Sequence, residues 1–182
     1  MQTPLTPSAG TAQPAGPAPG LIYAGFGIRL VALIVDFLVI GAIGGLVADI
    51  LGLGFIGLWG ADWRDLAFWH VRYLGGTWLA WLVLQALISG AYFVYSWTHW
   101  SATPGQRLMN LQVRMDNNGS QPSQDVAIKR WALLTVPIVG NLPVFGFLVF
   151  VYQLYLAWTT SHDPNKQGFH DQRCGTVVVR EL

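Results

Sequence analysis

The chain has 182 residues, of which 53% are hydrophobic and only 10% are Asp, Glu, Lys or Arg. A soluble domain carries roughly 25% charged residues, so this chain has too few ionised groups to cover a surface in water, and we expect it to lie in a lipid bilayer. Ten basic against nine acidic residues give a formal charge of +1, and no long basic run is present, which argues against a nucleic-acid partner.

Residues 1–26 form the first compositional segment. They contain no charged side chain and are dense in Pro, Gly, Ala and Thr. Such a composition buries too little apolar surface to offset the entropy of ordering the chain, so we expect a flexible tail. A secretory signal needs basic residues ahead of its apolar core, and nothing basic precedes Arg29. The first apolar segment is therefore expected to be retained.

Two segments are long and apolar enough to be predicted as transmembrane helices. Residues 27–51 are apolar except for three charged side chains, among them Arg29 and Asp36, and residues 77–97 carry no charge. A helix needs about 20 apolar residues to span the hydrocarbon core, and both segments meet that length. Residues 59–75 mix tryptophan with charged side chains, which is typical of an interfacial loop or short helix.

Small and polar residues in the two predicted spans indicate how they meet. Gly41, Gly44 and Gly45 would let a neighbouring helix approach closely. Gln85 is the only amide in the second span, and it either bonds across to another helix or marks a substrate path.

Residues 98–130 are predicted to form a cytoplasmic loop, because Lys and Arg gather in the connections that face the cytoplasm. With two spans before this loop, the N-terminal tail is then cytoplasmic as well. Within the loop 98–130, apolar and polar residues alternate over 111–115, which predicts a short strand. The Val-rich stretch 176–180 is the candidate partner of this strand in a small sheet. The basic residues of the loop include Arg107, which is also a candidate lipid-headgroup contact.

Residues 131–158 are predicted to form a broken segment. One long tilted span would place the tail, residues 159–182, outside the cell. Pro137, Gly140, Asn141 and Pro143 would interrupt the helical hydrogen bonds, however, and favour a segment that dips into the membrane and returns.

Arg29 and Asp36 are seven positions apart, close to two helical turns, so both project from nearly the same face about 10 Å apart along the axis. A charge in the hydrocarbon core costs about 3 kcal/mol or more, so each needs a partner. Helical side chains lean toward the N-terminus, so Arg29 points away from Asp36. The candidate partner for Arg29 is Asp171, if the tail is cytoplasmic. The candidate partners for Asp36 are Arg107, Lys129, Arg130 and a second subunit.

Several short motifs together resemble one family. They are FGIRLVA at 26–32, Asp36, TPGQRL at 103–108, LQVR at 111–114, FHD at 169–171 and GTVVV at 175–179. In order and spacing they resemble the RDD family of small bacterial membrane proteins over residues 24–180. That family is named for one arginine and two aspartates, which by position here are Arg29, Asp36 and Asp171. The resemblance implies a membrane protein, and transport, including sodium and proton exchange, has been proposed for some members.

Metal-binding residue types gather near the C-terminus, at His162, Asp163, His170, Asp171 and Cys174, and raise a metal-dependent membrane enzyme as an outside possibility. Their spacing matches no tight ligand signature. We therefore expect no catalytic residue, no metal and no cofactor. A single cysteine also excludes an intrachain disulfide.

The predicted fold is an all-α integral membrane protein with two clear transmembrane helices, a broken third or re-entrant segment and a small cytoplasmic strand pair. Residues 27–182 form the membrane domain, placed in a bacterial inner membrane with the N-terminus in the cytoplasm. The expected function is that of an accessory or docking subunit of a larger assembly, with other membrane subunits or a second copy as partners. The alternative is ion or solute transport by an oligomer, in which Asp36 carries a proton or cation.

Overall fold

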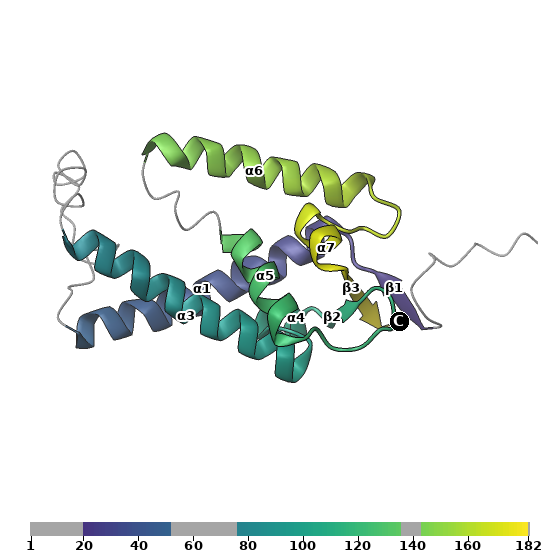
Figure 1. Cartoon of the computed structure of the whole chain (residues 1–182), viewed down its shortest axis with the longest axis horizontal. Helices are drawn as coiled ribbons and strands as arrows, with labels where there is room; N and C mark the ends of the chain where they lie inside the picture. Colours follow the sequence, from purple (N-terminus) through teal and green to yellow (C-terminus); the bar gives the residue numbers. More distant parts are fainter. Residues whose placement is uncertain (1–19, 52–75, 136–142, 182) are drawn as a thin grey trace, which may run out of the picture.

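The computed structural model describes residues 20–51, 76–135 and 143–181. In chain order the elements are β1 Leu21–Tyr23, α1 Phe26–Ile50, α3 Gly76–Trp100, α4 Pro104–Leu108, β2 Leu111–Met115, α5 Gln124–Thr135, α6 Pro143–His162, α7 Phe169–Cys174 and β3 Thr176–Glu181. The three long helices are α1, α3 and α6, and the sheet and α7 lie toward the end of α1 at which it begins (Figure 1). The described chain is therefore mostly helical, with a small sheet at one end.

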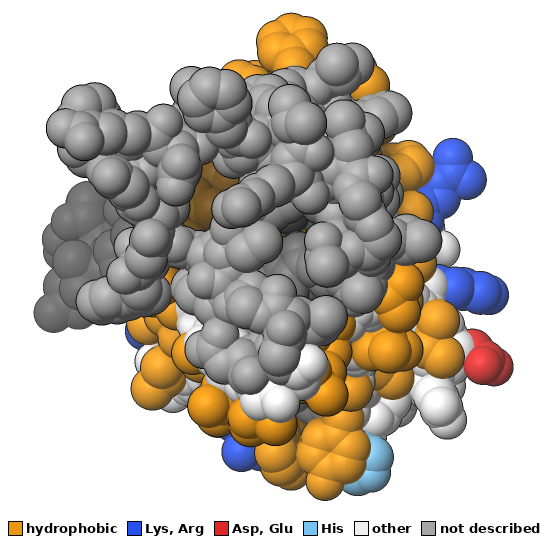
Figure 2. All heavy atoms as spheres, turned by 90° about the vertical axis from the view of Figure 1, so that its left-hand side faces the viewer, with side chains coloured by type: hydrophobic (Ala, Val, Ile, Leu, Met, Phe, Trp, Pro, Cys, Tyr) orange, Lys and Arg blue, Asp and Glu red, His pale blue; other side chains and the backbone are white. Residues whose placement is uncertain are grey.

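Within the described residues, one stretch is long and apolar enough to cross a membrane, Phe26–Val47 in α1, with a mean hydropathy of 2.6. Many large apolar side chains of α1 lie on its outside, such as Leu38, which is 69% exposed. Apolar side chains also cover much of the described surface in Figure 2. The second predicted span forms the helix α3, and that α3 crosses a bilayer stays a prediction. Residues 59–75 lie outside the described residues.

The sheet has the order β1-β3-β2, and both pairings are antiparallel. Val113 of β2 lies opposite Val178 of β3, so the strand pair expected from residues 111–115 and 176–180 is present. The valines of β3 are buried, as suits β-branched side chains in a central strand.

β1 corrects the predicted boundary of the N-terminal tail. The expected tail included residues 21–26, but Leu21–Tyr23 pair with residues 179–181 of β3, and Phe26 begins α1. These residues are apolar and their backbone groups complete the free edge of β3, which explains why they are ordered. Residues 1–19 lie outside the described part of the chain.

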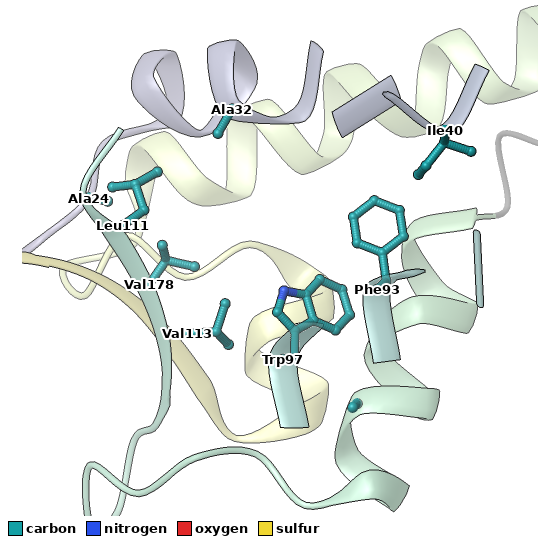
Figure 3. Packing of buried hydrophobic residues seen from close by; sticks show 9 residues of the cluster. Ala24, Ala32, Ile40, Phe93, Trp97, Leu111, Val113 and Val178 are labelled. Carbon is teal, nitrogen blue, oxygen red and sulfur yellow. The ribbon is translucent and has the colours of Figure 1, made fainter. Parts of the chain in front are cut away.

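The hydrophobic core joins the sheet to α1 and α3. Phe93 and Trp97 of α3 are 2% and 1% exposed, and their ring centroids lie 5.1 Å apart. Figure 3 shows them converging with Ala32 of α1 and with Val113 and Val178 of the sheet. The sheet is thus a packed part of the helical body.

Glycines in α1 and α3 allow close packing between helices. A Cβ added at Gly44 would collide with the amide of Gln85, so the first and second predicted spans meet there. A Cβ at Gly90 would lie 3.2 Å from the indole of Trp131 in α5. Gly41, in contrast, has open space around it. Close approach is therefore confirmed at Gly44 and absent at Gly41.

The predicted broken segment forms parts of two separate helices. α5 ends at Thr135 and α6 begins at Pro143, where proline is well tolerated because the first helical residues have no intrahelical acceptor for their N–H groups. Pro137, Gly140 and Asn141 lie outside the described residues. α5 begins at Gln124, inside the segment predicted as a polar loop. Whether residues 131–158 cross the membrane or return stays a prediction.

Candidate functional site

Asp171 is the centre of the first buried polar cluster. Its side chain is fully buried in α7, and its Oδ2 lies 2.7 Å from Nη1 of Arg29. Its Oδ1 forms an ion pair with Nη1 of Arg130 and accepts a 3.3 Å hydrogen bond from Oγ1 of Thr176. The N–H of Gly168 donates to Oδ2 at 3.1 Å. One carboxylate thus joins α1, α5, α7 and β3.

Arg29 makes further bonds that fasten α1 to the sheet. Its Nε donates to the carbonyl of Ala24 at 2.9 Å, and its Nη2 donates to the carbonyl of Val178 at 3.4 Å. Ala24 follows β1, and its own N–H bonds to the carbonyl of Val178 at 2.9 Å. The pairing with Asp171 expected for Arg29 is therefore present, together with backbone contacts that the sequence does not reveal.

The charges around Asp171 set its ionisation and that of His170. Burial alone would raise the pKa of Asp171, but the charges of Arg130 and Arg29 outweigh burial and hold its pKa well below the ordinary value. Burial lowers the pKa of His170 to about 4, although its Nε2 lies 3.5 Å from Oδ1 of Asp171. At neutral pH the cluster therefore holds a carboxylate, two arginines and a neutral imidazole.

Asp36 forms a second cluster with neutral donors. The carboxylate is 1% exposed. Its Oδ1 accepts hydrogen bonds from the hydroxyl of Tyr92 at 2.7 Å and from the N–H of Gly105 at 2.8 Å. Its Oδ2 accepts from the hydroxyl of Thr103 at 2.5 Å. Asp36 thus joins α1 to α3 and to the first turn of α4.

The prediction that a lysine or arginine of this chain pairs with Asp36 is wrong for the described residues. Among the described residues, no lysine or arginine lies within ion-pair distance of it. Arg130 pairs with Asp171, Arg107 lies over the ring of Trp100 at 4.7 Å, and Lys129 is exposed. The physical reason is that an N–H group at the start of a helix and two hydroxyl groups satisfy a buried carboxylate without a second buried charge. A contact with a second subunit is not tested.

The motif TPGQRL explains how these donors are held. Oγ1 of Thr103 accepts from the N–H of Gln106 at 3.2 Å, and Oε1 of Gln106 accepts from the N–H of Thr103 at 2.9 Å. This is a capping box, and its signature was visible in the sequence as Thr followed three residues later by Gln. A Cβ at Gly105 would lie 2.8 Å from Oδ1 of Asp36 and would collide with the carbonyl of Ala32. Only glycine permits this approach.

Of the candidate metal residues, His170 and Asp171 are neighbours, with Nε2 lying 3.5 Å from Oδ1. A ring nitrogen of His162 lies 2.9 Å from the carbonyl of Trp158, and Cys174 is buried at the end of α7. The described residues include no group of three or more His, Cys, Asp or Glu side chains that could hold a metal ion. Chemically, the two clusters are suited to holding elements together, because their strongest acceptors are already bonded within the chain.

Comparison with known proteins gives one match. A family model described as the RDD family matches residues 23–175. No curated protein and no solved structure matches the chain. The matched region contains Arg29, Asp36 and Asp171, the central residues of both buried clusters.

Proposed function

The chain belongs to the RDD family, and from that premise we propose that it is an accessory or docking subunit of a larger bacterial inner-membrane assembly. In this role it has no catalytic activity of its own, and Arg29, Asp36 and Asp171 maintain its fold. Family membership and the apolar helix α1 suggest a small membrane protein. The multi-pass topology, with the N-terminus, the sheet and α7 in the cytoplasm, is part of the proposal.

The observation that carries this proposal is the complete internal bonding of the family's charged residues. Asp171 is bonded to two arginines, and Asp36 accepts three hydrogen bonds from neutral donors. A carboxylate that carries an ion through a membrane must exchange its partners during each cycle. Here the loss of those partners would also separate α1 from α4 and α7. The arrangement therefore favours an architectural role for these residues.

The proposed docking role uses the outer faces of the long helices. The Asp171 cluster fixes the sheet to α1, while large side chains of α6 remain exposed. Phe147 is 69% exposed, Phe150 is 59% and Trp158 is 60%. Aromatic side chains are enriched in the centres of protein interfaces. We therefore assign partner contact to α6, with lipid covering the remaining apolar surface.

One observation favours the alternative function, ion or solute transport by an oligomer. A cavity of about 80 Å³ lies among α1, α3, α5, α6 and α7, and both Arg29 and Asp36 line it. In the transport alternative this cavity would be the solute or ion site. The two functions make opposite predictions for the isolated protein, and a pair of experiments separates them.

The first experiment is reconstitution of the purified full chain in vesicles with an imposed pH gradient. The accessory role predicts that added sodium does not dissipate the gradient in vesicles with the wild-type chain or with Asp36→Asn. Sodium-dependent dissipation by the wild-type chain that Asp36→Asn abolishes would instead establish transport.

The second experiment is purification of the tagged chain in mild detergent. The accessory role predicts a membrane protein that co-purifies at constant stoichiometry. Replacement of Phe147 and Phe150 by alanine should release it, whereas Leu38→Ala on the outside of α1 should not. A homogeneous, partner-free product from the wild-type chain would refute the accessory role.

A further inference from the structure

A second cavity lies where the end of α3, the short helix α4 and the strands β2 and β3 meet (Figure 1). Its volume is about 220 Å³. A single water occupies roughly 10–15 Å³ on this measure, so the space is large enough for a polar group of several heavy atoms. Among the described residues, Arg107 and Glu181 are the charged side chains of its wall. The wall therefore carries one charge of each sign.

Arg107 is held beside this cavity by an aromatic ring. Its guanidinium lies 4.7 Å from the centroid of the Trp100 ring, whose face attracts the cation. Stacking covers the flat face of a guanidinium and leaves the N–H groups at its edge for an acceptor. The side chain is exposed, and within the described residues these N–H groups form no hydrogen bond or ion pair. A ligand in the cavity can therefore reach them.

The Asp36 cluster fixes the position of Arg107. Arg107 lies in the last turn of α4, and its N–H donates to the carbonyl of Thr103 at 2.8 Å. Thr103 and Gly105, at the start of α4, both donate to Asp36. The helix that carries Arg107 is thus fastened to α1. Such preorganisation lowers the entropic cost of binding a ligand.

Glu181 supplies the negative charge of the wall. Its Oε1 accepts a 2.9 Å hydrogen bond from Nε2 of Gln112. Its Oε2 accepts no hydrogen bond within the described residues, so it can accept one from a ligand. Arg114 and Arg180 are not part of the wall, and Arg114 donates to Oε1 of Gln112. The wall therefore suits a ligand that carries an anionic and a cationic group.

Two exposed apolar side chains at this cavity indicate contact with lipid. Trp100, whose ring is part of the wall, is 43% exposed, and Leu108, which follows Arg107 in α4, is 68% exposed. Trp100 is the last residue of α3, which contains the second predicted span. Tryptophan at the end of a span is typical of the headgroup level. In the proposed topology the cavity therefore lies among the headgroups of the cytoplasmic leaflet.

We propose that this cavity binds the phosphoethanolamine headgroup of a phospholipid. Arg107 binds the phosphate oxygens with charge-assisted hydrogen bonds, and Glu181 accepts hydrogen bonds from the ammonium group. An anionic headgroup without an amine leaves the carboxylate without a counter-charge, and a quaternary amine has no N–H group to donate. The inference goes beyond the accessory role and rests only on the proposed position of α3 in the membrane.

The test uses the full chain, purified in a maltoside detergent. Calorimetric titrations at matched ionic strength compare free phosphoethanolamine with three short-chain phospholipids, which share their acyl chains and carry ethanolamine, choline or glycerol headgroups. Arg107→Gln removes the phosphate ligand, and Glu181→Gln removes the negative charge. The control Arg173→Gln also removes an exposed arginine that lies over a ring, that of Phe169 at 5.1 Å. The control Asp125→Asn removes an exposed carboxylate in α5. Neither control residue lines the cavity.

Saturable binding of the ethanolamine lipid, tighter by about tenfold or more than binding of the other two lipids, would support the site. Arg107→Gln should weaken this binding by about tenfold or more, Glu181→Gln should remove the preference for the ethanolamine lipid, and both controls should bind as the wild-type chain does.

Equal affinity of the wild-type chain for the three lipids, or no saturable binding, would overturn the proposal, even if a variant failed to fold. Unchanged affinity in folded Arg107→Gln would overturn it as well. Free phosphoethanolamine that binds as tightly as the lipid would refute a lipid as the ligand. Because these titrations contain no partner protein, a negative result leaves the accessory role to the co-purification experiment.

Discussion

Arg29 and Asp171 are 142 positions apart in the chain, and Nη1 of the arginine lies 2.7 Å from Oδ2 of the aspartate. The contact joins the first turn of α1 to α7, two elements that lie far apart in the sequence. Arg130 bonds to the other carboxylate oxygen. Asp171 therefore pairs with two arginines at once, and its loss should be felt in α1, α5, α7 and β3.

We predict that Asp171→Asn strongly destabilises the protein. The change leaves Arg29 and the almost fully buried Arg130 without a counter-charge. Removing one partner of a buried ion pair costs about 3–5 kcal/mol. Thermal or denaturant unfolding in detergent measures this loss. Asp125→Asn, an exposed change in the first turn of α5, is the matched control and should cost only a few tenths of a kcal/mol. Equal stability of the two variants would contradict the central role of Asp171.

Gly105 is predicted to tolerate no larger residue. In Gly105→Ala the new Cβ would lie 2.8 Å from Oδ1 of Asp36 and would collide with the carbonyl of Ala32. Overpacking of this kind costs about 1–3 kcal/mol, and here it would push α4 away from α1. Gly41→Ala is the control, because the Cβ would meet open space and alanine favours the helix. Unfolding should show a loss for the first variant and no loss for the second, and the reverse order would refute the packing.

His170 is predicted to make stability depend on pH. Its pKa is about 4 in the folded protein and 6.5 ordinarily, because burial disfavours the charged imidazole. Between these values the unfolded chain binds the proton and the folded protein does not, so stability falls as the pH is lowered from 6.5 to 4. The full difference corresponds to about 3 kcal/mol as an upper bound. The pKa of Asp171 is also lowered in the folded protein, so the stability that Asp171 contributes is lost only when the pH falls below its ordinary pKa of 3.8.

Unfolding of the wild-type chain and of His170→Gln over this pH range checks the prediction. The glutamine cannot be protonated, so the variant should show a flatter dependence between pH 6.5 and 4. An unchanged slope in His170→Gln would assign the dependence to other groups. The wild-type chain and His170→Gln should both still lose stability below pH 3.8, where Asp171 becomes protonated in the unfolded chain.

The features that local pattern determines could be predicted from the sequence. The alternation over residues 111–115 and the valines over 176–180 predicted β2 and β3, and the spacing of Arg29 and Asp36 placed both on one face of α1. The contact between Arg29 and Asp171 followed from the need for a counter-charge and from the family's motifs.

The partners of Asp36 could not be predicted in the same way. In the sequence, a buried carboxylate suggests a lysine or arginine as its partner. Hydroxyl and backbone N–H groups satisfy a buried carboxylate equally well, however. Tyr92 gives no local sign that its hydroxyl meets α1. β1 was missed because three residues are too few to show alternation, and because its order depends on a free edge supplied by residues 179–181.

The side of the membrane on which the sheet lies can be tested with cysteine labelling, but Cys174 is a poor probe. Its side chain is 8% exposed, and burial raises the pKa of its thiol, so little reactive thiolate is present. We predict that it reacts much more slowly with a membrane-impermeant maleimide than a cysteine at Gln172, an exposed position in the same helix.

In a Cys174→Ala background, Gln172→Cys and Gln121→Cys should be protected in intact cells and labelled in inverted vesicles. Both must behave alike, because β2 and β3, which these positions flank, pair in one sheet. Labelling of both in intact cells would place the sheet outside and reverse the proposed topology.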